Sequence, residues 1–391
     1  MVLSSRRCLP VWLALSALST SLVVQAQSAY TLTTLKMPSE SSDQRLHIDT
    51  KSRVTGTVTL LAGFRSDSAL GGFPGPYYNN YMGQWVVPTL GTTVSYAKVS
   101  STPGFLYGAS PDGNKLVSEA GLFDRATNKF QAMPLAYASD VNNAGKVVGI
   151  YSVNAPAGAQ VDSNNIDAYA RASTWSPGQA ATTLVTNAQF PGARAFGVNN
   201  AGVVAGVVYG AQSTLNTRAA RWVNGVLEVL ENQPGKGSLA LDVSDGGQVL
   251  IMGWDTQVVR VPTSGGQFFD RVDQINKGFG VFANGAYTPI VSNVAGYAVY
   301  NARGISSSGT VVGVLGPDLS AGSTATTRRA YIWQNGLMRD LTTLVASKGV
   351  KLPTGAVLNN VVAINDQGSV VAAYNNPKTQ APVYVRLQAK P

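Results

Sequence analysis

The chain has 391 residues and a formal net charge of +9, with 45% hydrophobic residues but a single cysteine and a single histidine. Charged residues make up 13% of it and no block of lysine and arginine occurs, so the concentrated basic face of a nucleic-acid-binding protein is not predicted. One histidine and one cysteine exclude histidine-rich and thiolate-rich metal sites, and we predict neither a metal nor a cofactor.

The N-terminus has the pattern of an export signal. Arg6 and Arg7 precede an apolar run over residues 11–24, and Val24-Gln25-Ala26 matches a small-residue cleavage site. As a helix the run would span about 21 Å, too short for the ~30 Å core of a bilayer. We predict a signal peptide at residues 1–26 and a single domain at 27–391, without a transmembrane segment. The mature protein is expected to be secreted to the exterior or, alternatively, kept in a periplasm.

A short motif recurs along the rest of the chain. YASDVNNAGKVVG (137–149) returns as AFGVNNAGVVAG (195–206), ARGISSSGTVVG (302–313) and VVAINDQGSVVAA (361–373). Such recurrence indicates one small supersecondary unit repeated many times. The apolar residue that opens each of seven copies is Ile48, Ala109, Val141, Val198, Val243, Ile305 or Ile364. A segment around Ile275 is a candidate for an incomplete eighth copy.

Each copy reads as β-structure. Residues 138–141 predict a short strand, residues 142–145 a turn closed by a glycine, and residues 146–150 a β-branched return strand. A third strand carries the pattern Arg-x-x-x-Trp, and a fourth ends at a leucine. Seven copies of four strands predict an all-β fold, a β-propeller of about seven four-stranded blades. We expect Tyr30–Leu35 and residues 383–387 to close the ring.

The pattern A-x-x-[IV]-N-x-x-G-x-V-V-G, followed by A-x-x-W-x-x-G and a closing leucine, resembles the HAF-repeat family of bacterial extracellular proteins. The opening YTLTTL (30–35) is also similar to the start of that family, and the resemblance covers essentially the whole mature chain. It implies export. It brings no established activity, so it implies no catalytic residue.

The residue before each opening apolar position defines a set of equivalent places in the copies. His47, Asp140 and Asp242 occupy three of them, and glycine or alanine occupies most of the others. One reading makes these residues parts of the scaffold. The other makes them converge from three blades near the central channel as an acid–base group. No G-x-S-x-G elbow accompanies them, so a serine hydrolase is not predicted.

An aromatic segment over residues 70–85, LGGFPGPYYNNYMGQW, differs from the repeats around it. Read as a glycine- and proline-rich loop, it either packs on itself or presents rings that stack on sugars or peptides. The candidate binding residues there are Phe73, Tyr77, Tyr78 and Tyr81.

The sequence favours a non-enzymatic binding or interaction protein of the bacterial cell surface or exterior, with a polysaccharide or a surface protein as its partner. A net charge of +7, which remains once Arg6 and Arg7 are removed, is compatible with an anionic polysaccharide. Two alternatives stay open: a propeller glycosidase or polysaccharide lyase using the carboxylates of Asp140 and Asp242, and a structural component of the envelope.

Overall fold

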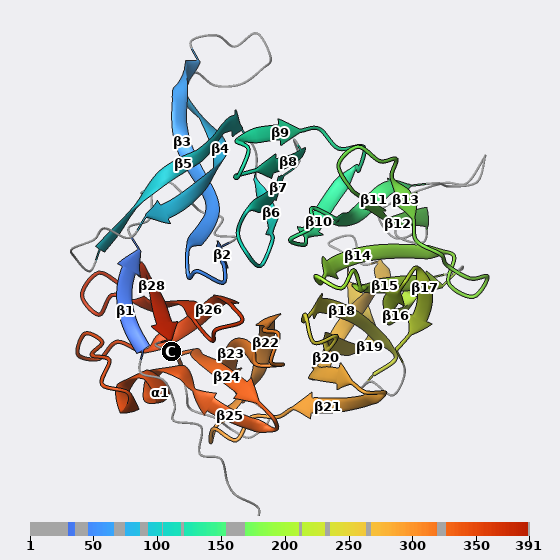
Figure 1. Cartoon of the computed structure of the whole chain (residues 1–391). Helices are drawn as coiled ribbons and strands as arrows, with labels where there is room; N and C mark the ends of the chain where they lie inside the picture. Colours follow the sequence, from blue (N-terminus) through green and yellow to red (C-terminus); the bar gives the residue numbers. More distant parts are fainter. Residues whose placement is uncertain are drawn as a thin grey trace, which may run out of the picture.

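The computed structural model arranges the chain as a ring of small β-sheets around a central axis (Figure 1). It describes residues 30–35, 46–65, 75–86, 93–103, 105–118, 121–153, 169–210, 213–230, 235–262, 267–318 and 326–389. Each copy of the motif belongs to a set of four strands that lie from the axis outwards, and we call each such set a unit, numbered 1 to 7 in the chain order of the motif.

The four strands of a unit occupy equivalent places in the ring. The innermost strands are β2 (Leu46–Ile48), β6 (Leu106–Ala109), β10 (Tyr137–Val141), β14 (Gly192–Val198), β18 (Gly237–Val243), β22 (Tyr297–Ile305) and β26 (Leu358–Ile364). The second strands are β3 (Val54–Arg65), β7 (Lys115–Ser118), β11 (Val147–Val153), β15 (Val204–Gly210), β19 (Val249–Pro262), β23 (Val311–Pro317) and β27 (Val370–Asn375). The third strands are β4 (Gly75–Val86), β8 (Gly121–Asp124), β12 (Ala170–Trp175), β16 (Ser213–Val223), β20 (Phe268–Ala283), β24 (Arg329–Gln334) and β28 (Pro382–Ala389). The outer strands are β5 (Thr93–Pro103), β9 (Lys129–Gln131), β13 (Thr182–Thr183), β17 (Val226–Val229), β21 (Ala286–Ile290), β25 (Leu337–Asp340) and, in unit 7, β1 (Tyr30–Leu35).

The all-β propeller prediction is confirmed, but the number of separate blades is six rather than about seven. Five sheets have four strands and one has eight, in the order β2-β3-β4-β5-β1-β28-β27-β26. The count differs because β1 pairs antiparallel with β28 and also parallel with β5, which joins units 1 and 7 into one sheet. The same pairing confirms that the two termini close the ring.

The seven opening residues of the motif each end an innermost strand, and the turn that follows is held in the same way every time. The first turn residue is Asp, Ser or Asn, and its side-chain oxygen accepts a hydrogen bond from a backbone N–H four or five residues further on. In six of the seven turns a glycine has a positive φ, for example 81° at Gly145 and 80° at Gly202, a conformation that side chains with a Cβ disfavour; in unit 1 Ser52 takes this place with a φ of 58°. The motif is therefore repeated because each of these turns requires the same types of residue.

Asparagine at the first turn position also ties neighbouring units together. The Asn142 amide donates to the carbonyl of Asn199 (3.0 Å), Asn199 donates to Ser244 (3.0 Å), and Asn365 donates to Asp49 (2.6 Å). These side chains are buried, so each bond also satisfies polar groups that burial would otherwise leave unpaired. The same asparagine thus stabilises its own turn and joins its unit to the next one in the ring.

The core consists of apolar layers between adjacent sheets. Trp222 on β16 is buried, and its indole N–H donates to the Val185 carbonyl of the preceding unit at 2.7 Å. One short helix, α1 (Leu341–Ser347), follows β25 and was not expected from the sequence; Asp340 caps it by accepting from the Thr343 N–H. The segment around Ile275 lies within β20, so the expectation of an eighth copy there is wrong.

Candidate functional site

A cavity of about 270 Å³ lies on the ring axis, at the end where the innermost strands turn back. Its wall is made by those strands and by the turns that follow them, including Ser110, Asn199, Ser244 and Asn365. Because six of the seven innermost strands shift register just before their last residues, each of the six carries a β-bulge at this depth. A bulge adds one residue and re-aims the side chains beside it.

His47, Asp140 and Asp242 all line this cavity. They come from units 1, 3 and 5, and the equivalent places in the intervening units 2 and 4 are Gly108 and Gly197. The structure therefore brings these three residues together at one cavity, as one of the two interpretations of the sequence expected. It does not by itself assign a catalytic role to any of the three residues.

The glycines make room for the carboxyl groups. A Cβ atom at Gly108 would lie 2.7 Å from the Asp140 Cα and 3.0 Å from its Oδ1. A Cβ atom at Gly197 would lie 3.1 Å from the Asp242 Oδ1. Contacts this short force a neighbour to move, so the alternation of side chain and glycine around the axis is a steric requirement of the site.

The Asp140 carboxyl group reaches across to the next unit. Its Oδ2 accepts a hydrogen bond from the Val198 N–H at 3.0 Å. Burial, and after it the neighbouring Asp242 carboxylate, raise the pKa of Asp140 to about 8, although hydrogen bonds from backbone N–H groups lower it. Asp140 is therefore mainly protonated at neutral pH and offers both a donor and an acceptor.

The Asp242 carboxyl group makes the equivalent link two units further on. Its Oδ1 accepts from the Val243 N–H (2.8 Å) and its Oδ2 from the Ile305 N–H of the next unit (3.4 Å). The pKa of Asp242 is raised to about 6, mainly by burial, with the two N–H donors acting against the rise and the nearby Asp366 adding to it. Burial therefore raises the pKa of both carboxyl groups, and that of Asp140 more than that of Asp242.

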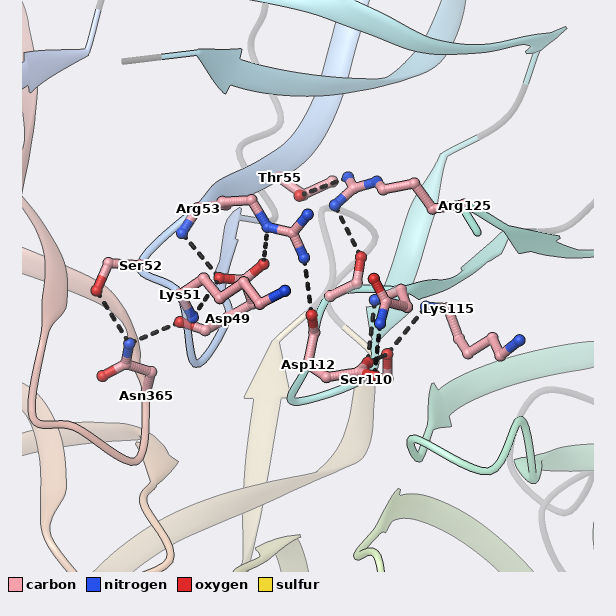
Figure 2. Close-up of polar contacts among 12 residues, drawn as sticks. Asp49, Lys51, Ser52, Arg53, Thr55, Ser110, Asp112, Lys115, Arg125 and Asn365 are labelled. Atoms are coloured by element: carbon pink, nitrogen blue, oxygen red, sulfur yellow. Dashed lines mark hydrogen bonds and ion pairs between the residues drawn. The ribbon is translucent and has the colours of Figure 1, made fainter. Parts of the chain in front are cut away.

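The turns around the cavity form a second polar ring. Asp112 N–H donates to Asn143 Oδ1 (2.9 Å), and Asn143 N–H donates in turn to Asn200 Oδ1 (2.9 Å). Figure 2 shows how unit 1 joins this ring: the Asp49 carboxylate accepts from the Arg53 side chain, and Arg53 also donates to the Asp112 carbonyl at 2.8 Å. The cavity is thus built on a wall whose polar groups are bonded from unit to unit.

The bulged residues of the wall were not identified from the sequence. Phe196, Leu241 and Arg303 occupy the bulges of units 4, 5 and 6 and line the cavity; the first two are half-buried and Arg303 is exposed. A signal for them exists. Ala138 and Val141 are both buried although they lie three residues apart, which a regular strand with a period of two does not allow. An inserted residue beside the candidate aspartate follows from that spacing.

The aromatic candidates lie elsewhere. Phe73 is outside the described residues, whereas Tyr77, Tyr78 and Tyr81 belong to β4, whose backbone pairs with β3. The expectation of a loop is therefore wrong for Gly75–Val86. Strand β3 leaves the cavity-side turn at Val54, and Tyr81 and Tyr77 pair with its residues Val58 and Gly63. At about 3.3 Å per residue, these tyrosines lie roughly 13–30 Å along the strand from the cavity end.

The arginines of the Arg-x-x-x-Trp pattern serve the scaffold. Arg171 donates to the Pro191 carbonyl at 2.9 Å, and Arg218 donates to the Lys236 carbonyl, each just before the innermost strand of the next unit. Within the described residues, no three His, Cys, Asp or Glu side chains are grouped to hold a metal ion. No helix in the same part of the chain is long and apolar enough to cross a membrane.

No protein-family model matches the chain, and no curated protein matches it either. Among solved structures, it is similar to the β-propeller domain of the Trilobed protease from Pyrococcus furiosus, at 10% identity and a TM-score of 0.48 over 93% of this chain and 95% of that one. It is also similar to a puromycin-hydrolysing peptidase from Mycobacterium tuberculosis (13% identity, TM-score 0.45, 91% and 55% covered). Dipeptidyl peptidase 4 from Porphyromonas gingivalis matches at 13% identity and a TM-score of 0.43, with 89% and 51% covered. These likenesses concern the fold alone.

Proposed function

We propose that this protein is a secreted, non-enzymatic binding protein whose ligand enters the cavity on the ring axis. The observation that carries the proposal is the convergence of His47, Asp140 and Asp242, from three units, on one cavity of about 270 Å³. Small-ligand sites have volumes of about 300–1,000 Å³. The cavity is therefore matched to one small group, such as the end of a glycan or a side chain of a surface protein, and an extended polymer does not fit inside it.

Export and family membership enter the proposal from the sequence. The signal at residues 1–26 supports secretion, with a periplasmic location as the alternative, and the repeat motif supports a place among HAF-repeat proteins. Neither argument depends on the cavity. A failure of the binding proposal would leave both of them standing.

A second candidate function, glycoside hydrolysis, is favoured by one observation: the pKa values of Asp140 and Asp242 differ, at about 8 and about 6. Enzymes that use two carboxyl groups as acid and base separate their pKa values in this way. In such a reaction Asp140 would protonate the leaving oxygen of the breaking C–O bond, and Asp242 would take a proton from the attacking water. One observation argues against hydrolysis. Both carboxyl groups accept hydrogen bonds from backbone N–H groups of the next unit, as expected of residues that join neighbouring units.

The exported protein is screened against an array of polysaccharides and surface-protein peptides, measuring retention and released reducing sugar. We expect retention without release, and its loss in an Asp140→Asn, Asp242→Asn double variant. The matched control is Glu228→Gln, which replaces a carboxylate on the outer strand β17. This variant should retain ligand normally. Released sugar that disappears in the double variant would establish the hydrolase instead. Retention lost only in a Tyr77→Ala, Tyr78→Ala variant would move the site to β4.

A further inference from the structure

Apolar side chains and carboxyl groups alternate along one side of the cavity. Phe196 is the bulged residue of unit 4, and it stands between Asp140 of unit 3 and Asp242 of unit 5 in the order of the ring. Leu241 precedes Asp242 as the bulged residue of unit 5. All four line the cavity and are half-buried. An aromatic ring is thus flanked by two hydrogen-bonding groups in a space of about 270 Å³.

The two carboxyl groups keep hydrogen-bonding capacity in addition to their bonds to the wall. Each carboxyl oxygen has two lone pairs. Backbone N–H groups make two bonds to each carboxyl group, from Val141 and Val198 to Asp140 and from Val243 and Ile305 to Asp242, so lone pairs remain on both. The remaining capacity is available to a ligand because both side chains line the cavity. The glycines at positions 108 and 197 keep the places beside them free of side chains.

We infer that this side of the cavity binds a single pyranose ring, the end of a glycan, with the carbon face of the sugar on Phe196 and its hydroxyl groups on Asp140 and Asp242. The inference rests on the proposed function and names its ligand class. A pyranose has an apolar face edged by hydroxyl groups, and those surfaces match an aromatic ring flanked by carboxyl groups. A polymer bound along its length is excluded by the size of the cavity.

The protonation state of Asp140 complements a polyol. Because burial and Asp242 raise the pKa of Asp140 to about 8, its neutral carboxyl group donates one hydrogen bond and accepts others. A hydroxyl group also donates and accepts, so it complements that group directly.

The test uses methyl α- and β-pyranosides of glucose, galactose, mannose and N-acetylglucosamine as probes of the exported protein, with saturation-transfer NMR for detection and titration for Kd. We expect at least one pyranoside to bind, and its affinity to fall at least tenfold in Phe196→Ala and in Asp242→Asn. The matched controls are Phe268→Ala, an exposed aromatic on β20, and Glu228→Gln on β17; both should bind as the unchanged protein does. Thermal unfolding of each variant checks that it folds. Gly197→Ala crowds Asp242 without removing a side chain from the cavity, so it perturbs the binding site independently of the other variants.

The outcomes separate this inference from the proposed function. If no pyranoside binds while another ligand is retained and lost in the Asp140→Asn, Asp242→Asn variant, the sugar assignment is wrong and the cavity remains the binding site. Pyranoside binding that is equally strong in Phe196→Ala and Asp242→Asn also overturns the assignment. Retention that never depends on the cavity variants removes both proposals together.

Discussion

Asp140 should make the folded protein less stable as the pH rises from 5 to 8. Its pKa is about 8 in the folded state against an ordinary 3.8, so between these values the folded protein binds more protons than the unfolded chain. By linkage, the stabilisation is complete below about pH 4 and is lost as the pH rises through about 8. Asp242, with a pKa of about 6, contributes in the same direction over the lower part of this range.

The magnitude follows from the shift of Asp140 from 3.8 to about 8, which corresponds to roughly 6 kcal/mol at about 1.4 kcal/mol per pKa unit. The carboxyl group is half-buried and faces the cavity, so solvent screening reduces this figure, and we expect about 2–3 kcal/mol. Below about pH 4 the trend reverses, since the pKa of groups such as Asp124 is held low by the Lys115 ammonium and their protonation destabilises the folded state.

The assay is denaturant unfolding followed by tryptophan fluorescence at pH 5, 6, 7 and 8. Asp140→Asn keeps an oxygen acceptor for the Val198 N–H and removes the titration, so its unfolding free energy should depend less on pH and should exceed that of the unchanged protein at pH 8. A profile for Asp140→Asn that is parallel to the unchanged one across the whole range would refute the reasoning.

Three further predictions concern the turns, the core and export. Asn199→Ala removes a buried donor to the next unit and should lower the unfolding free energy by about 1–3 kcal/mol, measured by denaturant titration; no change would show that the inter-unit bond is dispensable. Trp222→Phe leaves a carbonyl of the preceding unit unpaired and a small void, and a similar loss is expected in the same measurement. Mass spectrometry of the exported protein should find an N-terminus at residue 27, and an intact N-terminus would exclude cleavage after Ala26.

The architecture was predictable because the motif encodes a local requirement many times over. Asn142, Ser244 and their counterparts accept from a backbone N–H four or five residues on, and a glycine with positive φ closes every turn except that of unit 1. A local rule repeated along the chain is visible in sequence alone. The joining of units 1 and 7 was not visible, because the parallel contact of Thr34 and Leu35 with β5 depends on residues about sixty positions away.

The candidate site was predictable in part for the same reason. Residues before the opening apolar position can be aligned between copies, so His47, Asp140 and Asp242 could be placed at one depth of the ring. Phe196 was missed because a bulge is a departure from the period on which strand predictions rest. The tyrosines of β4 were misplaced because glycine, proline and asparagine around them suggested a loop, whereas long pairing with β3 keeps the segment extended.

The two aspartates connect ligand binding to the stability of the ring. Asp140 and Asp242 each bond the next unit through a backbone N–H while also lining the cavity, so a ligand that fixes their positions must also strengthen the junctions between units 3 and 4 and between units 5 and 6. A ligand that binds only the folded state at a hundred times its Kd stabilises that state by about 2.7 kcal/mol. The pyranoside that binds most tightly should therefore raise the unfolding midpoint of the unchanged protein, and raise that of Asp242→Asn by about half as much or less, since a tenfold weaker Kd leaves about 1.4 kcal/mol. An equal rise in both would place the ligand outside the cavity.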